Sequence, residues 1–345
     1  MRLRSIIKVL LLPNWAVNER IRLTNLLNTT NGKLVDAENH IKELTEVRVS
    51  LQDRLAELTD ERQRLREILD GFNSVQFVAP GHFYSPFPSK RDVEQHLTHR
   101  QSRLRELPGI RMDDAEQLEM LERLKTYYPR VPFKGEPVAP SLYPAENPNY
   151  PYADAAILFC MLSYLRPKRL IEIGSGFSTC AILDTNRLSL ESKTQVTSID
   201  PDAALLRSLI GKSADPLTVI ERKIQDLDLE LIDQLDAGDV LFIDSSHVSK
   251  LDSDVNYIFF EILPRLNSRV VIHFHDIYAG FEYPDEWLTE GRAWSEAYLL
   301  RAFLEYNGRF RILLFFDYMQ NAHPAWFQQN MPDLVEGSCF WMEKV

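Results

Sequence analysis

The sequence has few cysteines, no long apolar run and no excess of positive charge, and each shortage excludes a class of protein. Three scattered cysteines, Cys160, Cys180 and Cys339, are too few for a disulfide framework or a zinc site, and their odd number fits a reducing compartment. No apolar stretch approaches the roughly 18–20 residues of a transmembrane helix. Basic residues number 39 against 50 acidic ones, so the net charge of −11 argues against general duplex nucleic-acid binding.

The first residues combine positive charges with a short apolar core but depart from a secretory signal. Lys8 interrupts that core, and Pro13-Asn14-Trp15 stands where a cleavage site needs small residues. We therefore expect a cytoplasmic protein. Residues 1–33 carry six basic residues and one acidic residue, which predicts a basic arm. This arm is either a frayed, solvated segment or a weak peripheral contact with anionic lipid.

A heptad pattern then runs from Leu34 to Leu69 without a break. Two positions of each heptad form the seam, which is the stripe that would face a partner helix. The first seam position holds Leu34, Ile41, Arg48, Leu55, Arg62 and Leu69, and the second holds Ala37, Leu44, Leu51, Leu58 and Leu65. A 3.5-residue apolar period over about five heptads predicts a coiled coil at 34–71, ended by Gly71, and a parallel homodimer. The two seam arginines and sparse charge pairing oppose this prediction. The alternative is a long helix folded back onto its own domain.

Residues 72–150 read as a connecting or cap region. Residues 113–128 have the periodicity of one amphipathic helix. The passage from Tyr127 to Tyr152 holds seven of the nineteen prolines and cannot form a regular element. It is either a wall over a pocket or a surface linker.

After residue 150 strands and helices alternate, which predicts an α/β domain at 151–345. Apolar, strand-like runs lie at 169–173, 195–199, 217–222, 239–243, 269–274, 310–316 and 338–343. Helical stretches separate the first five runs, and a long loop joins the last two. The pattern predicts a doubly wound, mostly parallel seven-stranded sheet whose last strand is antiparallel.

A glycine-rich loop follows the first predicted strand. Gly174 and Gly176 let the backbone turn sharply and approach a ligand, with Ser175 between them, and Ser178 and Thr179 suit the following helix start. Two carboxylates strengthen this interpretation. Glu172 lies two residues before Gly174, and Asp200 ends the next strand, 24 residues after Gly176, near the offset expected for an acid that binds ribose hydroxyls.

This motif resembles the first two motifs of class I S-adenosylmethionine-dependent methyltransferases. The resemblance implies that Asp200 holds the cofactor's ribose, and that Glu172 supports the loop or the methionine amino group. It also implies that Gln225 or Asp226, after the third strand, meets the adenine. Ser178 replaces the family's third loop glycine. Thr179 stands where a dinucleotide-binding loop has its last glycine, so an NAD-dependent oxidoreductase is the weaker alternative.

Polar residues end the fourth and fifth predicted strands. Asp244 and His247 follow one strand, and His275 and Asp276 follow the other, so they should meet on one rim beside the cofactor. Asp244, His275 and Asp276 suit a divalent cation such as Mg²⁺. Alternatively His247 or His275, with Asp276, takes a proton, or these residues only cap strand ends. His273 fits a core histidine.

The Asp-x-x-His and His-Asp pair resembles a branch of class I methyltransferases that includes metal-assisted O-methyltransferases of sugars. The similarity covers roughly residues 140–345 and implies a hydroxyl-bearing small molecule or glycan as acceptor. The loop 277–287 suits a substrate pocket, although Tyr283, Trp287 and Trp294 fit packing anchors equally well. A non-catalytic coiled-coil scaffold with a degenerate methyltransferase fold is the alternative from another class.

Overall fold

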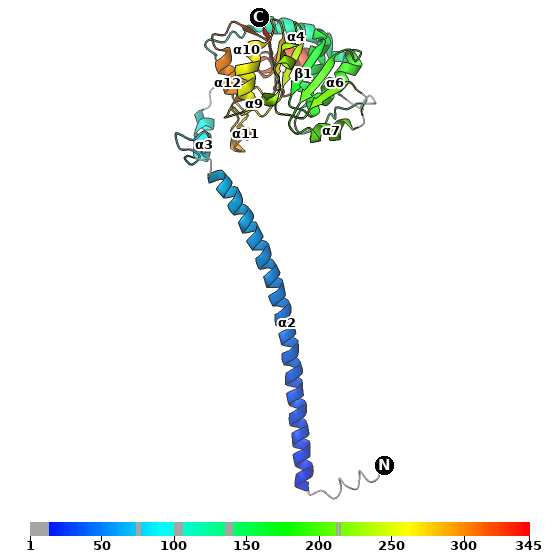
Figure 1. The fold of residues 1–345 in the computed structure, drawn as a ribbon, viewed down its shortest axis with the longest axis vertical. Coiled ribbons are helices and arrows are strands. Elements are labelled where there is room, and N and C mark those ends of the chain that lie inside the picture. The colour runs from blue at the N-terminus through cyan, green and yellow to red at the C-terminus, as the bar shows by residue number, and fades with distance from the viewer. Residues whose placement is uncertain (1–13, 74–76, 100–105, 135–140, 212, 214) are drawn as a thin grey trace. The chain divides into compact units, whose positions relative to one another are not determined.

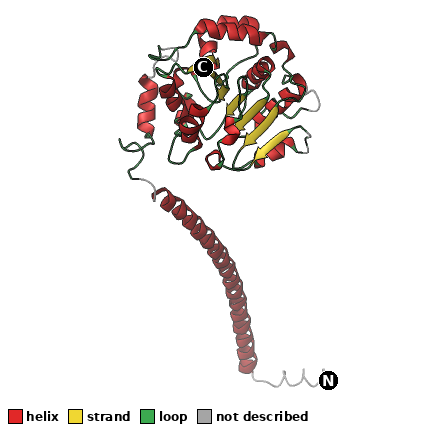
Figure 2. Ribbon diagram, turned by 45° about the horizontal axis from the view of Figure 1, so that its top comes forward, coloured by secondary structure: helices red, strands yellow, loops and turns green. Residues whose placement is uncertain are grey.

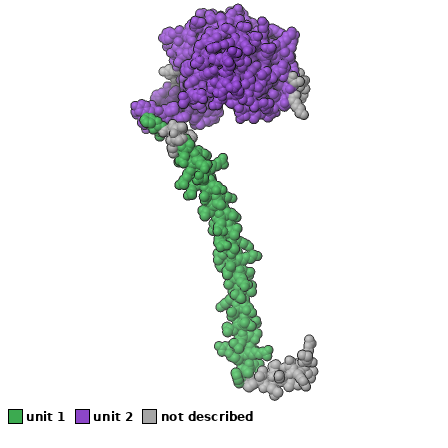
Figure 3. All heavy atoms as spheres, viewed as in Figure 1, with its two compact units in different colours: residues 1–79 green, residues 80–345 purple. Residues whose placement is uncertain are grey.

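The computed structural model describes residues 14–73, 77–99, 106–134, 141–211, 213 and 215–345. The chain divides into two compact units, residues 1–79 and residues 80–345, coloured separately in Figure 3. The first part of the predicted basic arm, residues 1–13, lies outside the described residues.

The first unit is dominated by one helix, α2 (Asn14–Asn73), labelled in Figure 1. It begins well before Leu34, so the predicted boundary between the basic arm and the heptad segment falls inside a continuous helix. Each residue from Asn18 to Gly71 is exposed, including the leucines of the heptad seam. Among the helices that the structure describes, none combines the length and the apolar character needed to cross a bilayer.

The second unit is built on a seven-stranded sheet, as predicted. The strands are β1 (Arg169–Ile173), β2 (Gln195–Ile199), β3 (Leu217–Ile220), β4 (Val240–Ile243), β5 (Val271–Phe274), β6 (Phe310–Phe315) and β7 (Phe340–Lys344). Their order is β3-β2-β1-β4-β5-β7-β6. The first five strands are parallel, and β7 runs antiparallel to both of its neighbours, β5 and β6.

Helices cover both faces of the sheet (Figure 2) because its strands bury side chains in both directions. In β4, Val240 and Phe242 pack with α4 (Asp114–Lys125), α5 (Tyr152–Leu165) and α6 (Phe177–Ser189). The intervening Leu241 and Ile243 pack with the helical segment α9–η3–α10 (Asp254–Arg265) and with α12 (Glu296–Leu304). This two-sided burial confirms the doubly wound fold.

Shorter elements complete the second unit. They are α3 (Lys90–His99), η1 (Tyr128–Arg130), α7 (Ala204–Ile210), η2 (Ile224–Asp226), α8 (Glu230–Asp233), η4 (Ala279–Phe281), α11 (Asp285–Thr289), α13 (Phe316–Ala322) and α14 (Pro324–Asn330). The predicted helix 113–128 is α4, which begins one residue later because the Asp113 side chain caps it by accepting from the Glu116 N–H.

The proline-rich passage packs onto the domain where the structure describes it. Tyr143 and Tyr150 are buried, and the buried Asp184 carboxylate accepts from the backbone N–H groups of Leu142 and Tyr143. The Tyr150 ring lies 4.9 Å from the ring of His275. This passage therefore forms part of the wall beside the carboxyl edge of the sheet.

Candidate active site

The glycine loop joins β1 to α6 and touches the end of β4. Gly174 has a φ of +90°, and a Cβ at this position would collide with the backbone carbonyl of Asp244. The Gly174 N–H donates to the carbonyl of Ile199 at 2.9 Å, and the Asp244 N–H donates to the carbonyl of Ile173 at 2.9 Å. Only glycine combines this conformation with so close an approach, so the ends of β1, β2 and β4 meet here.

Glu172 lies beneath the loop and is fully buried. Its carboxylate accepts hydrogen bonds from the hydroxyls of Ser178 at 2.8 Å, Thr179 at 2.6 Å and Ser198 at 2.9 Å. Burial raises the pKa of Glu172 to about 7, although these three hydroxyls oppose the rise. These contacts connect the start of α6 to β1, so Glu172 supports the glycine loop. Direct contact between Glu172 and a cofactor stays a prediction.

Asp200 stands beside the loop, as expected from its spacing. Its carboxylate accepts from the Ser175 hydroxyl at 2.7 Å and from the Asp202 N–H at 2.8 Å. The side chain is partly exposed at the carboxyl end of β2. Ser175 and the Asp202 N–H hold the Asp200 carboxylate in place, and its oxygens can accept further hydrogen bonds from ligand hydroxyls.

The proposed adenine contacts lie in the short helix η2. The Gln225 amide donates to the carbonyl of Asp252 at 2.7 Å, while its oxygen is buried and lacks a hydrogen-bond partner in the described ranges. Asp226 is exposed. Contact between either residue and an adenine ring stays a prediction.

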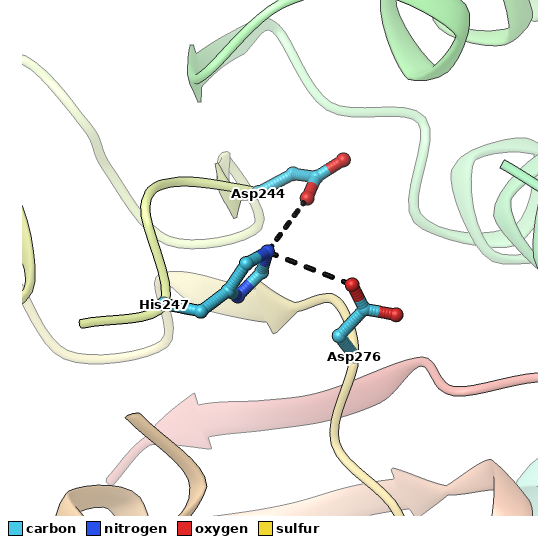
Figure 4. Close-up of side chains that lie close together, drawn as sticks. All are labelled: Asp244, His247 and Asp276. Atoms are coloured by element: carbon cyan, nitrogen blue, oxygen red, sulfur yellow. Dashed lines mark ion pairs between the residues drawn. The ribbon is translucent and has the colours of Figure 1, made fainter. Parts of the chain in front are cut away.

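Three side chains at the ends of β4 and β5 converge in a cluster of acids and imidazole, shown in Figure 4. The Nε2 atom of His247 lies 3.5 Å from an oxygen of Asp244 and 3.5 Å from an oxygen of Asp276. One ligand atom from each residue lies within 4.8 Å of the others. Two carboxylates and an imidazole at these distances can hold a divalent cation.

The histidine in this cluster is His247, whereas the sequence interpretation chose His275 as a ligand. His275 is buried behind the two acids, with its Nδ1 atom 3.5 Å from an oxygen of Asp244 and 3.5 Å from one of Asp276. Its Nε2 atom lies 3.4 Å from the buried carboxylate of Asp154. His275 thus faces both acids from beneath the cluster.

Each of the two histidines has a buried carboxylate behind it. The Glu296 carboxylate lies 2.8 Å from Nδ1 of His247, and Asp154 holds His275 while accepting from the Ser338 N–H. The Ser338 hydroxyl also donates to Asp276 at 3.1 Å. Such partners fix the orientation of an imidazole and raise its basicity.

These carboxylates set the charge of the imidazoles. Burial alone lowers the pKa of His247, but its hydrogen bonds to Asp244 and Glu296 and the charges of Glu296 and Asp276 raise it to about 10. Burial also opposes protonation of His275, yet the charges of Asp276 and Asp244 raise its pKa. The two imidazoles in turn lower the pKa of Asp244 against the effect of burial.

His273 has a different environment. It lies between the rings of Phe242 and Trp341, at 4.0 and 4.6 Å, and within the described part of the chain neither ring nitrogen has a hydrogen-bond partner. Burial holds its pKa well below the usual value, so it is a neutral core residue.

The backbone is strained at two residues of the cluster. His247 has a φ of 57° and Asp276 a φ of 59°, in the left-handed region that side chains rarely adopt. Each such residue costs on the order of 1–3 kcal/mol and persists only where its surroundings enforce the conformation, and such outliers concentrate at functional sites.

Aromatic side chains line one side of the cluster. The Trp294 ring lies 4.4 Å from the ring of His247 and 5.0 Å from that of Trp287, and both indoles are partly exposed. Arg292 lies over both indoles. Tyr283 is buried and accepts from the Ala297 N–H, so it is a packing anchor.

The sequence interpretation missed Asp154, Glu296 and Ser338. Asp154 carried a signal, because it is the one charged residue in the apolar helix α5. Glu296 stands in the first turn of α12, where acidic residues are common on any helix, and Ser338 in an unremarkable loop, so neither was distinguishable.

Comparison with known proteins adds independent observations. Residues 171–277 match a family described as a methyltransferase domain. An uncharacterized protein of Archaeoglobus fulgidus is 32% identical over 167 residues, which cover 46% of this chain and 73% of that protein. The solved structure of the Podospora anserina methyltransferase PaMTH1 with bound SAH overlaps 76% of this chain and 99% of its own, at 15% identity and a TM-score of 0.38. An O-methyltransferase from Bacillus cereus in complex with SAH overlaps 66% and 90%, at 14% identity and a TM-score of 0.35.

Proposed function

Since this chain carries an S-adenosylmethionine-dependent methyltransferase domain, matched over residues 171–277, we propose that it methylates a hydroxyl oxygen on a sugar or a related small-molecule or glycan acceptor. The observation that carries the proposal is the contact between the glycine loop and the acidic cluster. Gly174 lies directly against the backbone of Asp244, whose side chain belongs to the cluster with His247 and Asp276. A cofactor on the loop and an acceptor on the cluster would therefore be neighbours.

Bound S-adenosylmethionine supplies an electrophilic methyl group on its sulfonium. In this chain Asp200 is proposed to hold the ribose hydroxyls, with Ser175 orienting its carboxylate. Gly174 allows the loop to approach Asp244, Gly176 leaves room for the cofactor, and Glu172 keeps Ser178 and Thr179 in place below it. Holding the methyl donor and the acceptor oxygen in line supplies most of the rate acceleration in such a displacement.

A divalent cation fits the cluster chemically. Asp244, His247 and Asp276 would hold it, and the carboxylate of Glu296 behind His247 is the usual second partner of a ligating imidazole. Two nearby polar atoms, Ser245 Oγ and Glu296 Oε1, are buried and have no hydrogen-bond partner among the residues that the structure describes. Bound there, Mg²⁺ or a similar cation would supply positive charge that lowers the pKa of an acceptor hydroxyl.

The chain also offers its own proton acceptors. Asp276 and Asp244 are the more exposed members of the site, with 13% and 25% of their side chains accessible, whereas His247 and His275 lie beneath them. An acceptor hydroxyl would therefore meet a carboxylate first, and the imidazoles set that carboxylate's charge. The partly exposed Trp287 and Trp294 provide an apolar surface on which a sugar ring can stack.

Substitution of Asp200 tests the cofactor site. We expect Asp200→Ala to weaken S-adenosylmethionine binding at least about 100-fold, because two charge-assisted hydrogen bonds of about 1.5–3 kcal/mol each are lost. Isothermal titration calorimetry measures this. Asp202→Ala, two residues along on the same turn and exposed, is the matched control and should keep wild-type affinity. Equal affinity of both variants would remove the assignment.

The methyl acceptor can be identified from the product of methyl transfer. Purified enzyme with cofactor labelled in the methyl group is incubated with glycan and small-molecule fractions, and the labelled product is analysed for the atom that carries the label. A labelled ether oxygen on a sugar supports the proposal. Label on nitrogen, carbon or a nucleic acid contradicts it.

A further inference from the structure

Helix α2 presents a largely apolar seam whose residues are exposed from Arg20 to Leu69. Leu44 and Leu51 are 56% and 64% exposed, and the other seam leucines are similar. Isolated helices gain little stability from propensity alone, and most need to bury an apolar face. A contiguous apolar stripe of this size is the signature of a binding surface.

The seam is longer than the segment from Leu34 to Leu69. The same two heptad positions continue toward the start of the helix through Leu27, Arg20, Thr30, Leu23 and Ala16. A straight helix of 3.6 residues per turn drifts away from a 3.5-residue repeat. A repeat kept over roughly eight heptads therefore indicates supercoiling around another long helix of the same pitch.

We propose that α2 pairs with α2 of a second copy of this chain in a parallel, in-register, two-stranded coiled coil. The five seam leucines at 23, 44, 51, 58 and 65 share one heptad position. Leucine at this position is typical of two-stranded parallel coils.

Charges beside the seam agree with this register. In a parallel coiled coil, consider the residue that directly precedes the first seam position of a heptad. It faces the residue of the second copy whose number is higher by five. Lys33 then faces Glu38 of the second copy, and Glu61 faces Arg66 of the second copy. No pair of like charges arises at these positions along 16–69, so the register is attractive or neutral throughout.

The register also accommodates two of the three arginines in the seam. Arg20 follows Glu19 and Arg62 follows Glu61. In a parallel coiled coil, each seam side chain packs into a space between four side chains of the second copy. Each of these glutamates borders the space that receives the corresponding arginine, so each guanidinium meets a carboxylate. Arg48 follows Val47 and lacks such a partner. It costs stability, and it disfavours a third strand, which would bring three guanidinium groups together.

The mass of the full chain in solution tests the pairing. Light scattering should report twice the 40.1-kDa chain mass. Leu51→Asp with Leu58→Asp places charges in the seam and should raise the dimer Kd at least about 100-fold. Val35→Asp with Val49→Asp makes the same change on the outer face of the same helix and should leave the dimer intact. A wild-type monomer, or equal loss in both double variants, would overturn the proposal.

Cross-linking tests the direction and the register. The native cysteines are buried, so a cysteine introduced in α2 reports its own partner. Leu23→Cys and Leu65→Cys, each alone, should form disulfide-linked dimers on mild oxidation because identical seam positions face each other. A disulfide that forms only when the two variants are mixed would establish an antiparallel pair and refute the parallel one.

Discussion

At the scale of single residues, the site depends on acids that hold imidazoles. Glu296 and Asp154 lie behind His247 and His275, and both histidines have raised pKa values because of these partners and of Asp244 and Asp276. The carboxylates that orient the His247 imidazole as a metal ligand also keep it protonated when no cation is bound. Protein stability and cation binding should therefore both depend on pH in a predictable direction.

Without a cation, His247 should stabilise the fold at low pH. Its pKa is about 10 in the folded state against about 6.5 when unfolded, so its contribution is complete below about pH 6.5 and is lost as the pH rises toward 10. Glu296→Gln removes the paired charge and should cost about 2 kcal/mol at pH 6 but much less at pH 10. Urea unfolding with a chelator present measures this, with the exposed Glu286→Gln as control. A cost that does not change with pH would contradict the assignment.

Cation affinity should rise with pH. Binding through Nε2 of His247 requires that imidazole to lose a proton, so Mn²⁺ affinity should increase by nearly tenfold per pH unit between about pH 7 and pH 9. Calorimetry in buffers of different ionisation enthalpy measures the proton released. The Asp276→Asn variant should bind at least about tenfold more weakly at each pH. Binding without proton release would exclude His247 as a ligand.

At the scale of elements, the ends of β1, β2 and β4 are locked together at Gly174. This glycine has a positive φ and lies against the carbonyl of Asp244, so one backbone contact couples the cofactor loop to the acidic cluster. Gly176, two residues later, is less constrained, since a Cβ there would meet only a Leu205 methyl at an ordinary 3.5 Å.

The two loop glycines should therefore respond differently to the same substitution. Gly174→Ala should lose at least about 3 kcal/mol of unfolding free energy, because it adds strain at positive φ to a clash with backbone. Gly176→Ala should lose less than about 1 kcal/mol, while still crowding the cofactor surface. Denaturant unfolding monitored by tryptophan fluorescence separates the two. Similar stability losses would show that the close approach at Gly174 is not a constraint.

At the scale of the whole molecule, the chain consists of two units with different sources of stability. Residues 80–345 have a two-sided core of their own, whereas α2 gains its stability from the proposed pairing. Because pairing is a bimolecular reaction, only the stability of α2 should depend on protein concentration.

Thermal unfolding should show this difference. Four of the five tryptophans lie in residues 80–345 and only Trp15 lies in α2, so fluorescence mainly follows the second unit while circular dichroism at 222 nm follows both. We expect a helix transition whose midpoint rises by several degrees for a tenfold increase in concentration, and a fluorescence transition that stays constant. A single transition in both signals would mean that the units unfold together.

The sequence by itself determined the features that depend on periodicity and on local backbone chemistry. Two-sided apolar runs separated by helices specified the doubly wound sheet, a 3.5-residue repeat specified the long helix, and the spacing of Glu172, Gly174, Gly176 and Asp200 indicated the cofactor loop. Parallel strands end at one edge, so Asp244, His247, His275 and Asp276 were expected together, and the structure brings them together.

Only the tertiary structure decided which partners these residues have. Asp154, Glu296 and Ser338 come from α5, α12 and the approach to β7, far from the cluster in sequence, and no local pattern relates them to it. Likewise, only the folded chain shows that His247 as well as His275 places a ring nitrogen 3.5 Å from both Asp244 and Asp276. Contacts between distant segments carry no sequence periodicity, so they emerge only when the chain is folded.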